Sequence, residues 1–274
     1  MLLFPGCKIN LGLDVLARRA DGYHDLSTCM IPVSGLCDAV EMLPAAEDTL
    51  TVYGEAIDCP PEKNLCMKAL KLMQARHGAG NAHIYLQKHI PSGAGLGGGS
   101  ADAAAVILAA NEVFGLNLTQ TQMEAAAGEL GSDIPFFIAS RAAMATSRGE
   151  VLTPADPAIT AQLSGKYLLI VKPPVGVSTA EAYAGVRPAV PAVPLAEHLK
   201  APLAEWKATV ANAFEPHIFA AHPQLAAIKE RLYAAGALYA SMSGSGSALY
   251  GIFEREPEAA EFPAEYFVYK QVIP

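Results

Sequence analysis

Positive charge is scarce in this chain of 274 residues: 19 Lys and Arg stand against 27 Asp and Glu, which gives a formal net charge of −8. No stretch gathers Lys and Arg together, so the counterion release that drives binding to a polyanion is missing. We therefore expect no nucleic acid partner. An acidic protein that binds phosphates has to gather backbone N–H groups and a few cations at one site.

Cysteines are few and long hydrophobic runs are lacking. The five cysteines are an odd number and include no CxxC pair, so reduced thiols are a simpler interpretation than a disulfide framework. No segment approaches the ~20 apolar residues that span a bilayer. The start, residues 1–5, has neither the basic region nor the apolar core of an export signal. We expect a cytoplasmic protein with no membrane partner.

Hydrophobic residues make up 52% of the chain and charged residues 17%, which is typical of a folded enzyme. Strand and helix patterns mix in an α+β order. Strands are predicted over 7–15, 26–31, 39–43, 50–53, 82–88, 142–146, 167–171, 238–242, 248–253 and 266–272, and helices over 65–77, from the glycine run to 114, 119–130, 203–214 and 223–235. Two domains are expected, 1–155 and 156–274, with the boundary in the Pro-containing stretch 152–157.

The most informative segment, residues 91–102, reads Pro-Ser-Gly-Ala-Gly-Leu-Gly-Gly-Gly-Ser-Ala-Asp, between a predicted strand and an apolar helix. Glycines let successive backbone N–H groups converge on one anion, and the N-terminus of the next helix adds a partial positive charge. A plain turn needs one or two glycines, whereas this segment has five, at 93, 95, 97, 98 and 99. The pattern predicts a phosphate-binding loop.

Several phosphate-binding folds contain glycine-rich loops of this kind. Gly93, Gly95 and Gly98 fit the G-x-G-x-x-G spacing of dinucleotide-binding folds. That fold needs an acidic residue about 20 positions further on, at the end of a second parallel strand, but residues 115–122 lead into a capped helix. A Walker A loop would end in Gly-Lys-Ser or Gly-Lys-Thr, and a protein kinase would carry His-Arg-Asp; the sequence has neither.

The loop resembles the ATP loop of the GHMP small-molecule kinases. Three further segments support the resemblance: Lys8-Ile9-Asn10-Leu11, Arg19-Ala20-Asp21-Gly22-Tyr23-His24 and Gly131-Ser132-Asp133-Ile134-Pro135-Phe136-Phe137. It implies a two-domain α+β fold, with an N-terminal domain like ribosomal protein S5 domain 2 and a ferredoxin-like α/β C-terminal domain. It also implies a phosphotransferase that uses ATP and Mg²⁺.

Within the family, the combination of these segments resembles kinases that phosphorylate the 2-hydroxyl of 4-diphosphocytidyl-2-C-methyl-D-erythritol in the non-mevalonate (methylerythritol phosphate) isoprenoid pathway. Arg-Ala-Asp-Gly-Tyr-His is the most discriminating segment. Kinases for homoserine, mevalonate or galactose share the loop but are not expected to carry that segment. Two alternatives stay open: another small-molecule kinase of the homoserine or mevalonate type, and a nucleotide-binding regulatory module without turnover. Intact Lys8 and Asp133 argue against the module.

The resemblance assigns catalytic roles to Lys8 and Asp133. Asp133 would be the general base that accepts the hydroxyl proton, and Lys8 would polarise that hydroxyl and hold Asp133 ionised. From the residues alone, Asp133 could equally cap a helix, and a lone strand lysine is usually solvated.

The other site residues implied by the resemblance fall into groups. The ATP-binding positions are Asn64, Leu65, Lys88, Pro91, Gly93, Gly95, Leu96, Gly97, Gly98, Gly99 and Ser100. The substrate-binding positions are Asn10, Tyr23, His24, Thr179 and Tyr183. His24 would read the cytosine edge and Tyr183 would stack on the base. The third glycine motif is Gly244, Ser245 and Gly246. Ser100 is also the candidate hydroxyl near Mg²⁺.

A few positions keep a second interpretation. Tyr183 could be a core aromatic residue, and the third glycine motif could be a β-turn between strands. A glycine pair is expected before Glu150, but the chain has Ser147-Arg148-Gly149, so Arg148 adds a cation that contacts a phosphate or faces solvent. We expect a monomer or a weak homodimer.

Overall fold

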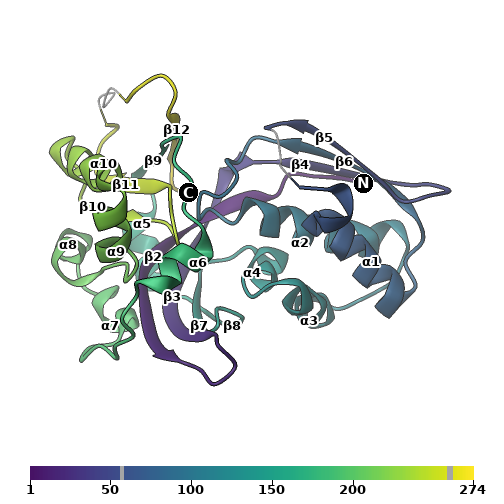
Figure 1. The fold of residues 1–274 in the computed structure, drawn as a ribbon, viewed down its shortest axis with the longest axis horizontal. Coiled ribbons are helices and arrows are strands. Elements are labelled where there is room, and N and C mark those ends of the chain that lie inside the picture. The colour runs from purple at the N-terminus through teal and green to yellow at the C-terminus, as the bar shows by residue number, and fades with distance from the viewer. Residues whose placement is uncertain (56–58, 258–261) are drawn as a thin grey trace. The chain divides into compact units, whose positions relative to one another are not determined.

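The structure of the protein is a computed structural model, and it describes residues 1–55, 59–257 and 262–274. Its described residues form two compact units that interleave along the chain (Figure 1). Unit 1 comprises Met1–Lys8, Pro32–Ser92 and Gly97–Arg141, and unit 2 comprises Ile9–Ile31, Gly93–Leu96 and Ala142–Pro274. The boundary after residue 155 stays a prediction, because interleaved units have no single boundary.

Unit 1 contains a four-stranded sheet in the order β1-β4-β6-β5. The strands are β1 (Leu2–Leu3), β4 (Ala39–Pro44), β5 (Thr49–Gly54) and β6 (Ala82–Lys88). β6 pairs antiparallel with β4 and parallel with β5. Every second residue of β6 is buried, as the alternation in its sequence predicts. The predicted strands at 39–43, 50–53 and 82–88 are confirmed.

Helices cover one face of this sheet (Figure 1). They are α1 (Leu65–His77), α2 (Gly98–Val113), α3 (Gln120–Leu130) and α4 (Ile134–Ala139), with a short η1 (Pro61–Lys63) before α1. α2 is rich in buried alanine, so α1 and β4 approach it closely. Asn64 caps α1 and Gly78 ends it in the left-handed region (φ 72°). Thr119 and Gln122 form the predicted capping box of α3.

Two long strands, β2 (Gly6–Arg18) and β3 (His24–Cys37), are joined by a turn and extend beyond the predicted limits of 7–15 and 26–31. They form a sheet in the order β2-β3-β7-β8 with β7 (Ala143–Ser147) and β8 (Val151–Pro154). β8 was not predicted, and it pairs antiparallel with β7.

The other sheet of unit 2 has the order β10-β11-β9-β12. Its antiparallel strands are β9 (Tyr167–Lys172), β10 (Tyr239–Met242), β11 (Leu249–Phe253) and β12 (Phe267–Val272). Helix α10 (Pro223–Ala234) packs against β10, β11 and α9 (Glu215–Ala221). Shorter helices are α5 (Pro157–Leu163), α6 (Thr179–Ala184), α7 (Leu195–His198), η2 (Leu203–Glu205) and α8 (Trp206–Thr209). The α+β class is confirmed, and no helix of the described chain is long and apolar enough to cross a membrane.

The predicted helix at 203–214 is wrong beyond α8. Val210 is extended (φ −105°, ψ 109°), and Ala213 N donates to Leu13 O at 2.8 Å. Leu13 N in turn donates to Ala211 O at 2.9 Å. Because strand β2 takes these backbone groups, the chain cannot continue its intrahelical hydrogen bonds. Tertiary pairing therefore overrides the helical spacing of apolar residues.

Candidate active site

The unit 1 part of the glycine loop lies at the start of α2 and leaves no room for a side chain at Gly97 or Gly98. Gly97 has φ 75°, and a Cβ there would lie 2.7 Å from Phe137 Cζ and 3.3 Å from Lys8 Cε. A Cβ at Gly98 would lie 2.8 Å from Ile90 Cγ2. At Gly99 the nearest atom would be Leu65 Cδ1, at 3.7 Å. The first N–H groups of α2 have no helical partner and can bind an anion.

The unit 2 part of the loop, Gly93–Leu96, lies against the third glycine motif. A Cβ at Gly95, which has φ 74°, would lie 2.0 Å from the carbonyl oxygen of Ser243. The Ser243 hydroxyl donates to Gly95 O at 2.9 Å, and Ala248 N donates to Ala94 O at 3.0 Å. Gly244 and Gly246 both have positive φ, 54° and 89°. The two glycine turns therefore meet backbone to backbone.

The dinucleotide-binding alternative does not fit this topology. After β6 and α2 the chain continues directly into α3 and α4, so residues 98–139 add no second parallel strand after the glycine loop. The strand that is parallel to β6 is β5, which precedes it. The glycine spacing at Gly93, Gly95 and Gly98 therefore comes from a different fold.

Lys8, Ser100 and Asp133 come together in unit 1. Asp133 immediately precedes α4, but its side chain makes no capping hydrogen bond. Instead Asp133 Oδ1 accepts a 2.8 Å hydrogen bond from the Ser100 hydroxyl. Lys8 is buried, and its pKa is lowered by burial, although the negative charge of Asp133 opposes this. The group combines a carboxylate, a hydroxyl and a poorly solvated ammonium.

Lys88 occupies a buried ion-pair cluster below the start of α2. Its ammonium contacts Asp38 and lies 2.8 Å from Asp102 Oδ2. Burial alone would lower the pKa of Lys88, but the charges of Asp102 and Asp38 outweigh it and raise that pKa. Asp38 Oδ1 also accepts from His89 N and Ile90 N, at 2.6 and 2.8 Å. Through Asp38, the Lys88 ion pair holds the segment before the glycine loop, and the assignment of Lys88 to ATP stays a prediction.

Asp102 is the buried carboxyl group that contacts Lys88 from α2. Its Oδ1 is buried, and among the described residues no hydrogen-bond partner reaches it. Burial raises the pKa of Asp102 to about 7, even though Lys88 opposes the shift. The sequence showed Asp102 as part of the loop motif, but Asp38 carried no signal because it lies 50 positions before Lys88.

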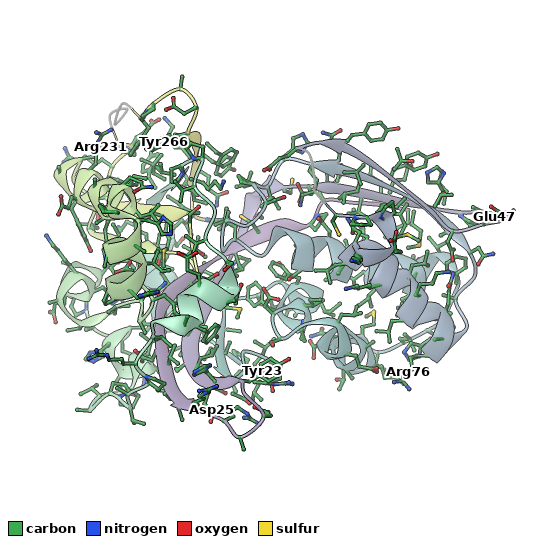
Figure 2. The ribbon with its side chains drawn as sticks, in the orientation of Figure 1. Tyr23, Asp25, Glu47, Arg76, Arg231 and Tyr266 are labelled. Atoms are coloured by element: carbon green, nitrogen blue, oxygen red, sulfur yellow. The ribbon has the colours of Figure 1, made fainter. Side chains whose placement is uncertain are left out.

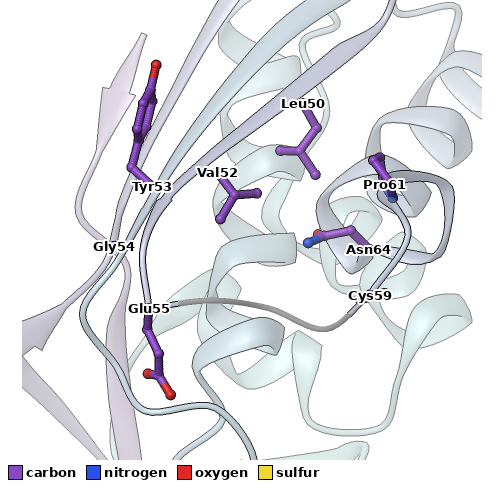
Figure 3. Close-up of a pocket in the computed structure, with 8 residues that line it drawn as sticks. All are labelled: Leu50, Val52, Tyr53, Gly54, Glu55, Cys59, Pro61 and Asn64. Carbon is purple, nitrogen blue, oxygen red and sulfur yellow. The ribbon is translucent and has the colours of Figure 1, made fainter.

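A pocket of about 360 Å³ opens beside this cluster (Figure 3). It is lined by Leu50, Val52, Tyr53, Gly54, Glu55, Cys59, Pro61 and Asn64. Leu50, Val52 and Asn64 point toward its interior, whereas Tyr53 points away. Asn64 Oδ1 accepts from Cys66 N at 2.9 Å, which fixes its side chain. Glu55 accepts from Ser92 N at 3.3 Å, so the pocket borders the residue after Pro91.

In unit 2 the predicted substrate aromatics stack on one another. The His24 and Tyr183 rings are 4.8 Å apart with an interplanar angle of 23°. Tyr183 also makes an edge contact with Phe214 at 4.9 Å. Tyr183 therefore packs on the core with one part of its ring and supports His24 with another. Thr179 is exposed at the start of α6.

Tyr23 extends from the turn between β2 and β3, near Asp25 (Figure 2), and is 56% exposed. The Arg148 guanidinium lies 5.2 Å from the centre of its ring. Asp21 Oδ1 accepts from Tyr23 N at 3.1 Å, and Arg19 pairs with both Asp21 and Asp25. This turn chemistry explains why the Arg-Ala-Asp-Gly-Tyr-His segment presents Tyr23 to solvent.

Asn10 is fixed by a buried hydrogen-bond network. Its Nδ2 donates to the Thr28 hydroxyl at 3.0 Å, and that hydroxyl donates to Gly12 O at 2.6 Å. The Tyr250 hydroxyl donates to Asn10 O at 2.7 Å, and the Ser243 hydroxyl reaches Asn10 Oδ1 at 3.5 Å. The predicted substrate residue on β2 is thereby tied to the third glycine motif.

Comparisons with known proteins agree with this arrangement. The GHMP kinases N terminal domain matches residues 64–141, and the GHMP kinases C terminal domain matches residues 196–267. The chain is 44% identical over 255 residues to the 4-diphosphocytidyl-2-C-methyl-D-erythritol kinase of Parabacteroides distasonis, covering 93% of this chain and 92% of that protein.

Solved structures give the same result. A 4-(cytidine 5'-diphospho)-2C-methyl-D-erythritol kinase is 35% identical with a TM-score of 0.77, covering 93% of this chain and 90% of its own. A homoserine kinase from Cytophaga hutchinsonii is 18% identical with a TM-score of 0.61, covering 98% and 94% of the two chains, and shares the fold alone. The predicted two-domain fold is confirmed. The chain belongs to the 4-diphosphocytidyl-2-C-methyl-D-erythritol kinases of the GHMP kinase family.

Proposed function

We propose that this protein transfers the γ-phosphoryl group of ATP to the 2-hydroxyl of 4-diphosphocytidyl-2-C-methyl-D-erythritol. The observation that carries the proposal is the arrangement of Asp133, which accepts a hydrogen bond from Ser100 and interacts with the charge of buried Lys8 at the start of α2. The names of the closely similar proteins supply the substrate. Phosphoryl transfer depends on positioning and on charge stabilisation, which this group provides.

In this mechanism Asp133 accepts the proton of the attacking hydroxyl. The ammonium of Lys8 stabilises the developing negative charge, and it is effective because burial keeps water from screening it. The N–H groups at the start of α2, where Gly97 and Gly98 leave no side chain in the way, hold the phosphates of ATP. The hydroxyl attacks the phosphorus in line, and ADP leaves with the bridging oxygen.

Mg²⁺ fits this site as an ion bound chiefly by nucleotide oxygens and water. Among the residues that the structure describes, no three His, Cys, Asp or Glu side chains are grouped to hold a metal ion. Ser100 and Asp133 do offer oxygen atoms, the ligand type that Mg²⁺ prefers. When bound, the ion would neutralise charge on the β- and γ-phosphates. Ser100 is the residue that we assign to it.

Each nucleotide has a matching set of residues. The pocket beside Asn64 combines aliphatic walls from Leu50 and Val52 with one polar side chain, which suits the adenine of ATP. The stacked rings of His24 and Tyr183, with exposed Tyr23, suit a pyrimidine base, because bases stack on aromatic side chains. Asn10 and Thr179 are assigned to the same substrate.

A coupled ADP-release assay tests the proposal. Purified protein is given ATP and Mg²⁺ with diphosphocytidyl methylerythritol, homoserine or mevalonate in turn. Turnover with the cytidine substrate alone is expected. Turnover with another alcohol would indicate a kinase of different specificity. ATP binding without turnover on any alcohol would favour a regulatory module.

The Asp133→Asn variant sharpens this assay. General base catalysis typically contributes ~10² to 10⁴ in rate, so turnover should collapse while ATP binding persists. Asn keeps the size of the side chain and can still accept from Ser100. Unchanged turnover would remove Asp133 from the mechanism.

A further inference from the structure

The segment 212–215, Asn-Ala-Phe-Glu, was expected to end a helix, but its contacts point to another role. Its backbone is fixed by pairing with Leu13 in β2. Three of its four side chains, those of Asn212, Phe214 and Glu215, are almost fully buried. Two of these are polar, and burying polar groups is costly unless each atom is bonded. The bonds that they make show what the segment holds.

Asn212 spans the end of β10 and the third glycine motif. It is 1% exposed, and its Nδ2 donates to Met242 O and to Gly244 O, both at 2.8 Å. Its Oδ1 accepts from Phe214 N at 3.0 Å. Both amide protons are thus used, and the amide oxygen accepts a third hydrogen bond. Asn212 sets the position of the turn relative to the strand before it.

Glu215 holds the same strand end from its other side. Its Oε1 accepts from Met242 N at 2.8 Å and from the Ser241 hydroxyl at 3.1 Å, and its Oε2 accepts from Lys229 Nζ at 2.6 Å. The backbone N–H and the backbone C=O of Met242 are therefore both hydrogen-bonded to side chains of the segment 212–215. Hydrogen bonds to a charged acceptor are the stronger kind.

The turn fixed in this way is the one that meets the glycine loop. Ser243, next to Met242, donates to Gly95 O and reaches Asn10 Oδ1, and its own carbonyl leaves no space for a Cβ at Gly95. A displacement of Met242 or Gly244 would move these contacts with it, because a closely packed backbone transmits shifts. Asn212 thus acts on the phosphate-binding loop through one intermediate turn.

Phe214 points from the same segment toward the substrate aromatics. Its ring, 2% exposed, makes the edge contact with Tyr183, which in turn stacks on His24. Edge contacts of this kind contribute beyond the area they bury. Removing the Phe214 ring would leave Tyr183 free to tilt away from His24.

We propose that Asn212, Phe214 and Glu215 form one positioning element that sets the third glycine motif and the Tyr183–His24 pair in their working geometry. The proposal rests on the proposed function for the identity of the ligands. None of the three side chains needs to touch a substrate. A single short segment would then coordinate the nucleotide side and the cytidine side of unit 2.

The test compares three variants with wild type. Asn212→Asp keeps the size of the side chain and its acceptor but loses both donors, Phe214→Leu keeps the core filled but loses the edge contact, and Ile228→Ala is a control of the same core cluster. The measurements are kcat, KM for each substrate, and the dissociation constants of ATP and of cytidine diphosphate. The melting temperature is recorded for every variant.

A split between ligands is expected. Asn212→Asp should lower kcat and weaken ATP binding about tenfold, the loss of one or two buried hydrogen bonds, with cytidine diphosphate binding close to wild type. Phe214→Leu should weaken cytidine diphosphate binding about fivefold, as for one lost aromatic contact, with ATP binding unchanged. Ile228→Ala should lower the melting temperature and leave both affinities near wild type.

The proposal is overturned if both variants weaken both ligands by the same factor, or if neither changes more than the Ile228→Ala control. Glu215 adds a rescue test: Glu215→Gln keeps the acceptor for Met242 N and should bind ATP better than Glu215→Ala. Equal affinities in these two would also count against it. Because binding constants need no turnover, a failed ADP-release assay would refute the proposed reaction and leave this test decisive.

Discussion

The hydroxyl of Ser100 donates a 2.8 Å hydrogen bond to Oδ1 of Asp133, 33 positions along the chain. The sequence assigned these residues separately, one to the metal ion and the other to catalysis. The structure joins them, since Ser100 lies in the first turn of α2 and Asp133 directly before α4. Ser100 therefore orients the Asp133 carboxylate.

Ser100→Ala removes this contact and one candidate metal ligand. We expect kcat to fall by about 10 to 100-fold, since hydrogen bonds to charged groups contribute roughly 1.5 to 3 kcal/mol. Ser100→Thr keeps the hydroxyl and is the matched control, with kcat within a few-fold of wild type. Steady-state assays at several Mg²⁺ concentrations measure both. If Ser100→Ala matched wild type at all of them, Ser100 would have no part in orienting Asp133.

The charge of Lys8 should set the alkaline limit of activity. Burial lowers the pKa of Lys8 from the ordinary lysine value of 10.5, although Asp133 opposes the shift. Lys8 is protonated, and able to stabilise the transferred phosphoryl group, only below this lowered pKa. We expect kcat/KM to decline with rising pH before pH reaches 10.5. A pH–rate profile that is flat up to that value would contradict the assignment.

Lys8→Met provides the matched loss of charge. Removing one preorganised electrostatic group typically costs ~10² to 10³ in kcat, and the remaining activity should lack the alkaline decline. The aliphatic part of the side chain next to Gly97 is largely retained, so the fold should persist. Circular dichroism checks that it does.

Gly95 and Gly93 differ in what surrounds them although both have positive φ, 74° and 61°. A Cβ at Gly95 would lie 2.0 Å from Ser243 O, whereas a Cβ at Gly93 would have no atom of the described residues within 4 Å. Gly93→Ala should cost only the conformational strain, about 1 to 2 kcal/mol. Gly95→Ala adds overpacking and should cost about 2 to 5 kcal/mol. Urea unfolding compares the two, and equal losses would show that the Ser243 contact does not constrain Gly95.

The raised pKa of Asp102 predicts how the free energy of unfolding depends on pH. Its folded-state pKa of about 7 lies above the ordinary value of 3.8, because of burial. Between these values the native state binds more protons than the unfolded state. The contribution of Asp102 to the free energy of unfolding therefore falls as pH rises from 3.8 toward about 7. Asp102→Asn mimics the protonated acid and does not titrate.

The stability of Asp102→Asn relative to wild type should therefore improve with pH. We expect a gain of about 1 to 3 kcal/mol between about pH 5 and about pH 8, as the wild-type carboxyl ionises in a buried site. Urea unfolding of both proteins at each pH measures it. A difference that stays constant would mean that the pair with Lys88 keeps Asp102 ionised throughout.

Regular elements were predictable where local pattern and tertiary packing agree. β6 alternates buried and half-buried residues, and α3 begins with a capping box, so both were found from sequence. The prediction of a helix over 203–214 failed because Asn212 and its neighbours form hydrogen bonds with β2 and β10. The local sequence pattern carries no sign of these contacts.

The site was predictable in its residues more than in its contacts. The glycine run, Lys8 and Asp133 stand out through spacing and resemblance. The pairing of Lys88 with Asp38 does not, because Asp38 lies between β3 and β4, 50 positions before Lys88 in β6. Asn212 and Glu215 were missed for the same reason, since their polar partners are backbone groups of Met242.

Arg148 stands where the family pattern leads us to expect glycine, and its contact with Tyr23 gives it a testable role. The guanidinium lies 5.2 Å from the ring centre, and its Nε donates to Glu150 Oε1 at 3.2 Å, which holds it there. A cation over an exposed aromatic ring contributes about 0.5 to 1 kcal/mol. Because Tyr23 is 56% exposed, this contact limits where its ring can move.

Arg148→Met keeps an apolar side chain of similar length and removes the charge. If Arg148 holds Tyr23 for a cytosine ring, KM for the cytidine substrate should rise about two- to fivefold, while KM for ATP stays unchanged. The ATP value is the internal control, since the contact is with Tyr23 and not with the glycine loop. A larger rise, above about 20-fold, would exceed what a cation–π contact supplies and would mean that Arg148 itself binds the diphosphate.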